Sequence, residues 1–257
     1  MIRRSVVEVD GVSKTFTIPS SRRETVREHA LDFFRPRAQE RLHVLESVSF
    51  ELRQGESLGL MGRNGCGKST LLKIVSGIYP VDSGRVDVHA AVTPILELGV
   101  GQNPDLDAID NIELLGTVMG LTLKQLRAAT GEILEFAELE KFAHLELRHY
   151  SSGMAARLAY AVAFRAVREV LILDEVFAVG DAGFKERCQQ RYRDLHRAGH
   201  SMLLVSHEPR TIAAFCDRAL LLEGGHIVLS GAAETVANRY LELLTEEAAI
   251  SARPHAT

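Results

Sequence analysis

This sequence has few cysteines, no net positive charge and no long apolar run. Its three cysteines, Cys66, Cys188 and Cys216, are far apart, so they form neither a disulfide framework nor a C-x-x-C metal site. A formal net charge of −4 gives no electrostatic case for binding nucleic acid. No apolar run reaches the ~18 residues that span a bilayer, and the N-terminus lacks the apolar core of a signal peptide. We expect a cytoplasmic protein with no membrane span of its own.

The length of 257 residues is enough for one large core, or for one core with an attached subdomain. The sequence shows no internal repeat. It also shows no obvious second copy of the phosphate-binding loop described next, so a mechanism with two nucleotide sites would need a second chain.

The most informative stretch runs from residue 57 to 77. Residues 58–61 form a short apolar run that predicts a buried strand. A glycine-rich turn, 62–67, leads into Lys68, and apolar residues at helical spacing continue to Gly77, where a helix is expected to end. A strand, the pattern G-x-x-x-x-G-K-S and a helix together make the phosphate-binding P-loop. An ordinary glycine turn is the alternative, and the flanking strand and helix disfavour it.

The residue types of this loop each have a reason to be there. Glycines let the backbone approach a phosphate closely, while successive N–H groups and the helix N-terminus attract the anion. Lys68 can reach the β- and γ-phosphates, and the Ser69 hydroxyl can complete the shell of a Mg²⁺ ion. The predicted binding residues are Gly62, Arg63, Asn64, Gly65, Cys66, Gly67, Lys68, Ser69 and Thr70.

Strand patterns elsewhere in the chain predict an α/β fold. Residues 6–10 and 48–52 alternate as half-buried strands do, whereas 170–174 and 201–206 are nearly continuous apolar runs. Two glycines at 224–225 predict the turn of a β-hairpin. Strands that alternate with helices predict a mainly parallel sheet with both faces covered.

Two segments of the sequence interrupt this alternation of strands and helices. From 107 to 168 the pattern is helical: Gly120 ends one helix, and Thr122 with Gln125 forms a capping box for the next. We therefore expect an inserted helical subdomain at about 105–168. Residues 19–41 hold six arginines, four acids and an apolar cluster, which predicts a short amphipathic helix. This insertion is either a solvated surface segment or a docking surface for a partner or the membrane.

Three polar side chains follow buried strands. In a doubly wound sheet, ligands bind beyond the carboxyl ends of the strands. Asp174 is the expected Mg²⁺-supporting carboxylate, and Glu175 beside it could accept a proton from an attacking water. His207 follows the neighbouring strand, where a catalytic role competes with that of a structural histidine.

The residues Tyr-Ser-Ser-Gly-Met at 150–154 resemble the signature loop of ABC-type ATPases, whose common form is LSGGQ. The family's other markers match in order: LILDE at 171–175, a D-loop at 179–181 and a switch histidine at 206–207. The resemblance covers essentially the whole chain. It implies a single ABC ATPase domain over 1–257, with a P-loop NTPase core, a mainly parallel sheet, an antiparallel β part and the helical subdomain.

The resemblance also implies a head-to-tail homodimer that holds two ATP molecules, with Mg²⁺ as cofactor. Ser151, Ser152 and Gly153 would then contact the γ-phosphate of the ATP bound to the other chain. Phe16 matches the aromatic residue that stacks on adenine, with a strand-end core residue as the alternative. Within this scheme the catalytic residues are Lys68, Glu175 and His207, the metal residues are Ser69 and Asp174, and Asp181 belongs to the D-loop.

Two positions depart from the family pattern. The expected Q-loop glutamine is not plainly present: Glu97 falls nearest its place, with Gln102 as a rival, and Met154 replaces the signature glutamine. Both variations, together with the 19–41 insertion, are similar to the ATPase subunits that export lipid-linked bacterial polysaccharides such as O-antigen, capsule or teichoic acid. Some members of that branch carry a further C-terminal carbohydrate-binding domain, which we do not expect here.

The predicted function is therefore that of an ATP-hydrolysing exporter subunit. It would work at the cytoplasmic face of the cell membrane with a second copy of itself and a membrane-spanning permease, which would handle most of the glycolipid substrate. One alternative is an ABC ATPase for another transported solute. A second is a soluble ABC ATPase that acts on DNA or ribosomes, which the acidic balance disfavours.

Overall fold

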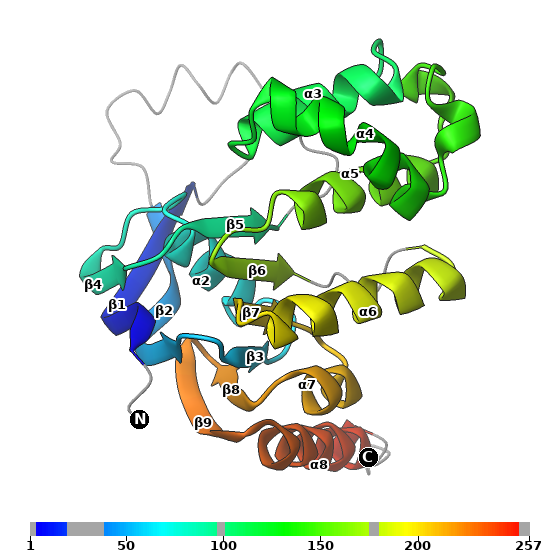
Figure 1. Cartoon of the computed structure of the whole chain (residues 1–257). Coiled ribbons are helices and arrows are strands. Elements are labelled where there is room, and N and C mark those ends of the chain that lie inside the picture. The colour runs from blue at the N-terminus through cyan, green and yellow to red at the C-terminus, as the bar shows by residue number, and fades with distance from the viewer. Residues whose placement is uncertain (1–3, 20–38, 97–100, 175–179, 252–257) are drawn as a thin grey trace, which may run out of the picture.

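The computed structural model describes residues 4–19, 39–96, 101–174 and 180–251 (Figure 1). At its centre is a six-stranded sheet in the order β5-β6-β7-β3-β8-β9. All neighbouring strands run parallel except β8 and β9, which form an antiparallel hairpin across Gly224 and Gly225. The mainly parallel sheet and the hairpin were both predicted, and both are confirmed. The strands are β3 (Ser57–Met61), β5 (Val92–Ile95), β6 (Val170–Asp174), β7 (Ser201–Val205), β8 (Arg218–Glu223) and β9 (His226–Ala232).

The apolar runs of the central strands divide between two cores. In β6, Leu171 and Leu173 belong to one buried cluster, whereas Val170 and Ile172 belong to the other. Because successive side chains of a strand point to opposite faces, a strand covered on both sides must be apolar at every position. This explains why β6, β7 and β3 read as continuous apolar runs.

One face of the sheet is covered by α6 (Ala182–Arg197), α7 (Pro209–Phe215) and α8 (Ala233–Ser251). The apolar face of α8 is buried at Val236 and Tyr240 and reaches the surface at Leu244. The other face packs against α2 (Lys68–Val75) and a second sheet. Helix α2 ends at Val75 with Ser76 as its C-cap, and Gly77 follows with a φ of 73°, close to the helix end that the sequence predicted there.

The second sheet is antiparallel, in the order β2-β1-β4, and lies on the left in Figure 1. Its strands are β1 (Ser5–Pro19), β2 (Gln39–Arg53) and β4 (Ser83–Val88). Strands over 6–10 and 48–52 were therefore predicted too short. The pairing of β1 with β2 shifts register around Val12, so the alternation of side chains is interrupted within one continuous strand.

The helical block lies above the central sheet in Figure 1 and has a core of its own. It contains α3 (Ala108–Val118), α4 (Leu123–Ala137), η1 (Glu140–Phe142), η2 (Leu147–His149) and α5 (Ser152–Arg165). The predicted capping box is present. The Thr122 side chain accepts a hydrogen bond from the Gln125 backbone N–H, and the Gln125 side chain accepts one from the Thr122 backbone N–H. The helical character predicted for 107–168 is thus confirmed.

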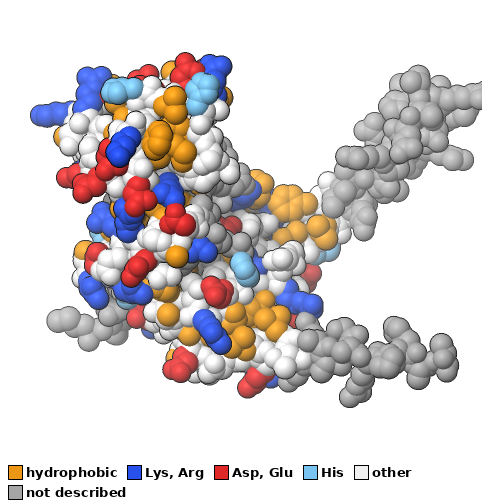
Figure 2. Space-filling model, turned by 90° about the vertical axis from the view of Figure 1, so that its right-hand side faces the viewer, with side chains coloured by type: hydrophobic (Ala, Val, Ile, Leu, Met, Phe, Trp, Pro, Cys, Tyr) orange, Lys and Arg blue, Asp and Glu red, His pale blue; other side chains and the backbone are white. Residues whose placement is uncertain are grey.

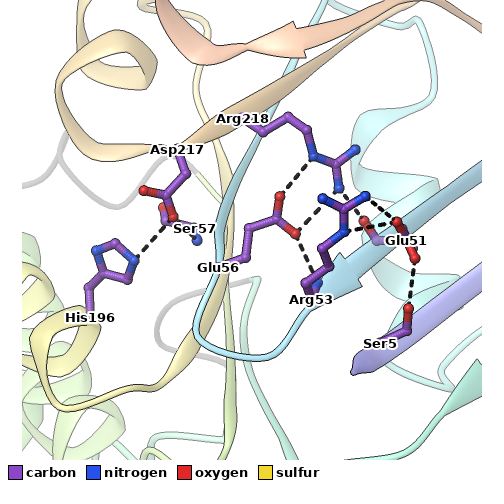
Figure 3. A network of polar contacts seen from close by, with 8 residues as sticks. All are labelled: Ser5, Glu51, Arg53, Glu56, Ser57, His196, Asp217 and Arg218. Atoms are coloured by element: carbon purple, nitrogen blue, oxygen red, sulfur yellow. Dashed lines mark hydrogen bonds and ion pairs between the residues drawn. The ribbon is translucent and has the colours of Figure 1, made fainter. Parts of the chain in front are cut away.

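A polar network joins the two sheets at the edge from which the parallel strands start (Figure 3). Arg218 Nε donates to Glu56 Oε1 at 2.8 Å, and the Arg218 guanidinium also donates to the backbone oxygen of Glu51 at 2.6 Å. Glu56 is almost fully buried. Ser5 Oγ donates to Glu51 Oε2 at 2.7 Å, so the network extends from β8 through β2 to β1.

Figure 2 views the side toward which β5 and β6 point in Figure 1. Acidic and basic side chains are interspersed over this face, and hydrophobic side chains gather on its upper, helical part. Among the described helices, none is both long enough and apolar enough to cross a membrane.

Candidate functional site

The P-loop connects β3 to α2, and its glycines allow close backbone packing. Gly67 precedes α2 with a φ of 109°, and a Cβ at this position would lie 2.8 Å from the backbone oxygen of Val44. A Cβ on Gly62 would lie 2.2 Å from the backbone oxygen of Leu222. Larger residues at these two positions would push the loop away from β2 and β8, so the neighbouring strands fix the loop in place.

Lys68, the first residue of α2, is held against the loop. Its Nζ donates to the backbone oxygens of Gly62 at 2.7 Å and Arg63 at 2.9 Å, and the residue is only 8% exposed. A buried ammonium beside a glycine-rich loop and the N-terminus of a helix is an arrangement that binds phosphate.

Ser69 and Asp174 meet at the end of β6. Ser69 Oγ donates to Asp174 Oδ2 at 3.1 Å. A hydroxyl and a carboxylate oxygen beside a phosphate-binding loop are the protein ligands that Mg²⁺ prefers, since this ion takes most of its other ligands from water and phosphate. The donor set fits a Mg²⁺ ion held together with a nucleotide. It does not form an all-protein cage, because no group of three or more His, Cys, Asp or Glu side chains in the described ranges could hold a metal.

A cavity of about 600 Å³ opens beside Lys68, Ser69 and Asp174. Its apolar end is formed by Phe16, Leu42, Val44 and Leu96. Phe16 and Leu42 are direct partners in the pairing of β1 with β2. The cavity therefore offers a polar end for phosphates and an apolar end for a base. Leu42 and Val44 were missed in the sequence, although their alternation continues that of β2 and could have extended the predicted strand.

The Phe16 ring is supported from two sides. The Phe16 and Tyr79 rings pack edge to face with their centroids 5.7 Å apart, and Lys14 Nζ lies 5.6 Å from the Phe16 ring centroid. Lys14 is itself fixed by Asp82, whose carboxylate accepts from Lys14 Nζ at 2.8 Å and from the Thr15 backbone at 2.6 Å. These contacts hold the pKa of Asp82 below its usual value. Phe16 is thus a half-buried, supported ring at a cavity, which is compatible with stacking on a base.

A second cavity, of about 900 Å³, lies next to the first at the P-loop. The two cavities share Asn64 and Gly65. His207, just after β7, lines this second cavity together with Cys66 and Glu223. Burial raises the pKa of the Cys66 thiol, and the nearby Lys68 ammonium opposes that shift. His207 is therefore brought to the P-loop, as expected for a strand-end residue.

The predicted signature residues lie at the start of α5. Ser151 is the N-cap, and its side chain accepts from the Met154 backbone at 3.2 Å. Ser152 and Ser151 are exposed, and Gly153 is half-buried. Of the described residues that line the two cavities, none comes from 151–153. This exposed helix N-terminus is therefore available to a ligand held by another molecule.

Asp181, which was predicted to belong to the D-loop, caps α6. Its Oδ1 accepts from the Phe184 backbone at 2.9 Å, and its Oδ2 accepts from the Arg157 guanidinium. The hydrogen bond from Phe184 and the charge of Arg157 hold the pKa of Asp181 below its usual value.

Several predictions fall outside the described ranges. They are the base Glu175, the Q-loop residue Glu97, Val179 of the D-loop and most of the insertion, 20–38. Gln102, the rival for the Q-loop position, is described: its Nε2 donates to the backbone oxygen of Ala155 in α5 at 2.9 Å. Gln102 thus contacts the signature helix.

Comparison with known proteins agrees with this geometry. The family model described as "ABC transporter" matches residues 45–178. An ABC transporter protein, AbcA of Aeromonas salmonicida, is 36% identical over 94% of this chain and 78% of its own length. The O-antigen export system ATP-binding protein RfbE of Yersinia enterocolitica is 41% identical over 72% of this chain and 77% of its own.

Other relatives are longer or more distant. The teichoic acids export ATP-binding protein TagH of Bacillus anthracis is 33% identical, and the match covers 82% of this chain but 38% of TagH. Among solved structures, a dimeric ATP-binding cassette bound to ADP and Pi superposes with a TM-score of 0.70 at 22% identity, over 88% of this chain and 98% of that one. The fold and the sequence relatives agree: this chain belongs to the ABC transporter family and forms an ATP-binding domain of it.

Proposed function

We propose that this chain is the ATP-hydrolysing subunit of an exporter for a lipid-linked polysaccharide, such as O-antigen, capsule or teichoic acid. One observation carries the ATPase part of the proposal: Ser69 and Asp174 meet 3.1 Å apart beside Lys68, at the polar end of a cavity whose other end is apolar. The export part is supported by the relatives named for O-antigen and teichoic acid export.

The described residues divide the chemistry of hydrolysis among them. Lys68 and the loop backbone bind the β- and γ-phosphates and orient the terminal phosphoryl group. Ser69 and Asp174 would hold Mg²⁺, which neutralises charge on the phosphates when bound. Asp174 accepts a hydrogen bond from the Ser69 hydroxyl, so the hydroxyl oxygen keeps lone pairs for the ion. His207, at the second cavity, would stabilise the γ-phosphate or orient the water, and Glu175 is the proposed base that polarises this water.

The working unit would be two copies arranged head to tail. The N-terminus of α5, with Ser151, Ser152 and Gly153, would contact the γ-phosphate of ATP held by the other copy. Its exposure, and its separation from the cavities of its own chain, support this arrangement. The pair would drive a membrane-spanning permease at the cytoplasmic face of the membrane. The permease would handle most of the glycolipid, and nucleic acid would play no part.

The test of the ATPase is phosphate release by the wild-type chain and by two variants. Lys68→Ala should lose ATP binding, whereas Glu175→Gln should bind ATP and hydrolyse it slowly. Lys124→Ala, on an exposed position of α4, is the matched control and should behave as wild type. Wild-type turnover by Glu175→Gln would show that another residue is the base.

The export part needs its own experiment. The chain should co-purify with a permease for a lipid-linked polysaccharide, and that permease should increase its ATP turnover in liposomes. Association only with a permease for small solutes would contradict polysaccharide export and leave the ATPase intact. Salt-sensitive binding to DNA or ribosomes would instead favour a soluble ATPase.

A further inference from the structure

Four charged side chains form a cluster where α4, α5 and α6 meet. Arg157 of α5 is at its centre: one guanidinium nitrogen donates to Glu138 Oε2 at 2.8 Å, and the other donates to Asp181 Oδ2. Glu138 Oε1 accepts from Arg187 of α6. One guanidinium thus bridges the end of α4 to the start of α6.

An aromatic layer lies beneath the charges and spans the same three helices. The Phe136 ring of α4 contacts Phe164 of α5 and Phe184 of α6, at centroid distances of 5.8 and 5.7 Å. The Arg157 guanidinium lies 5.5 Å from the Phe184 ring centroid, and its side chain is only 19% exposed. Arg157 is therefore held in one orientation by packing as well as by charge.

The backbone at Glu138 is unfavourable for a residue with a side chain. Glu138 ends α4 in the left-handed conformation, with φ 58° and ψ 42°. Glycine is the usual residue in this conformation, because a Cβ is penalised there. A glutamate at this position is best explained by its carboxylate, which pairs with both arginines.

The cluster connects two parts of the proposed site. Helix α5 begins at Ser151, the residue proposed to face the ATP of the other copy, and Arg157 lies in its second turn. Helix α6 begins at Asp181, which follows the Mg²⁺ residue Asp174 by only a few positions. A guanidinium bridge between these helices fixes the signature end of α5 relative to the N-terminus of α6.

We propose that Arg157 is a positioning residue that couples the signature helix to the nucleotide site through Asp181 and Glu138. This inference rests on the proposed ATPase function. The bridge would transmit the position of α5, once the second copy is engaged, to the N-terminus of α6, a few positions after Asp174 in the sequence. Its loss should slow turnover while leaving the ATP cavity of each chain unchanged, because Arg157 does not line that cavity.

The test separates turnover from binding and from stability. Arg157→Ala should lower kcat by about tenfold or more, as small displacements of catalytic groups do, and leave the Kd for ATP within about twofold. Arg157→Lys keeps one ion pair and should recover part of kcat. Asp181→Ser keeps the cap of α6 but loses the charge, and should lower kcat as Arg157→Ala does. The double variant should be no slower than either single one, because the two residues act as a unit.

Glu138→Gly distinguishes positioning from simple stabilisation. Glycine suits the left-handed backbone, so the melting temperature should be kept or raised, while kcat falls with the carboxylate gone. Arg127→Ala is the matched control, since it breaks the exposed Arg127–Glu113 pair between α4 and α3 and should leave kcat unchanged.

Two outcomes would overturn the inference alone: wild-type kcat in Arg157→Ala, or effects of Arg157→Ala and Asp181→Ser that multiply independently. A fall in kcat matched by lost ATP binding or by unfolding would also contradict it. A wild-type chain that hydrolyses no ATP would instead overturn the proposed function, and this inference with it.

Discussion

Ser69 and Asp174 are hydrogen-bonded at 3.1 Å, although 105 residues separate them in the sequence. Ser69 lies in the first turn of α2, and Asp174 ends β6. The parallel strands carry both side chains to the same edge of the sheet, where ligands of such folds bind. The pair places a hydroxyl oxygen and a carboxylate oxygen beside the P-loop, where both could bind Mg²⁺. This leads to the first prediction.

Asp174→Asn should weaken the use of Mg²⁺. We expect the Mg²⁺ concentration for half-maximal turnover to rise by about tenfold or more, since changes around a metal cost this much. ATP binding measured in EDTA should be unchanged. Asp110→Asn, on an exposed position of α3, is the control. An unchanged Mg²⁺ dependence in Asp174→Asn would remove this residue from the metal site.

The apolar end of the first cavity should bind the base of the nucleotide. Phe16→Ala should raise the Kd for ATP by about tenfold, because stacking of one base on an aromatic ring is worth about 1–3 kcal/mol. Leu42→Asn, opposite Phe16 in the sheet, should weaken ATP binding in the same direction. Inorganic tripolyphosphate has no base, so its affinity should not change in either variant.

The control for this prediction is Leu123→Asn, at an exposed leucine remote from both cavities. Equal losses for ATP and tripolyphosphate would show that Phe16 supports the loop instead of contacting the base.

The ion pair between the buried Glu56 and the half-buried Arg218 should be important for stability (Figure 3). Arg218→Met would leave the carboxylate of Glu56 buried without its partner, which should lower the free energy of unfolding by about 3 kcal/mol in urea. Arg53→Met removes an exposed ion pair with Glu51 in the same network, and should cost less than about 1 kcal/mol. Equal losses for the two variants would contradict the role of burial.

Alkylation of the three cysteines should be selective and should depend on pH. Burial raises the pKa of Cys188 and of Cys216 to about 12, so both thiols stay protonated and unreactive in the folded chain. Cys66 lines a cavity, and its raised pKa means little thiolate at neutral pH and faster reaction as the pH rises. Intact mass should show one label per chain, and ATP should protect against it.

Cys66→Ser provides the control, because it should take no label under the same conditions. Undiminished ATP binding by the labelled wild type would contradict the position of Cys66 beside the bound nucleotide.

Much of the fold could be predicted because its signals are local. The strand 170–174 is apolar up to Asp174 because both of its faces are buried, and the capping box at Thr122 and Gln125 is a pattern within four neighbouring positions. Strand β1 was predicted too short for a physical reason. The register shifts near Val12 break the alternation that a strand otherwise shows, so the pattern ends before the strand does.

The residues of the candidate site also divide into those that local sequence signals predict and those that depend on tertiary packing. The P-loop is contiguous, and the strand-end rule brings Asp174 and His207 to it, so these residues could be named from the sequence. Leu42 could not be assigned to the cavity, because its role depends on the register that places it opposite Phe16. The bridge from Arg157 to Glu138 and Asp181 depends on how three helices pack, and neither periodicity nor motif spacing carries that information.

The most direct test of the account is the mass of Glu175→Gln in solution with and without Mg-ATP. One chain has a mass of 28.3 kDa. We predict a monomer without nucleotide and a particle of twice that mass with Mg-ATP, which reverts to monomer when Lys68→Ala is added to the same chain. A particle that stays monomeric at saturating Mg-ATP would contradict the closure of two copies around ATP.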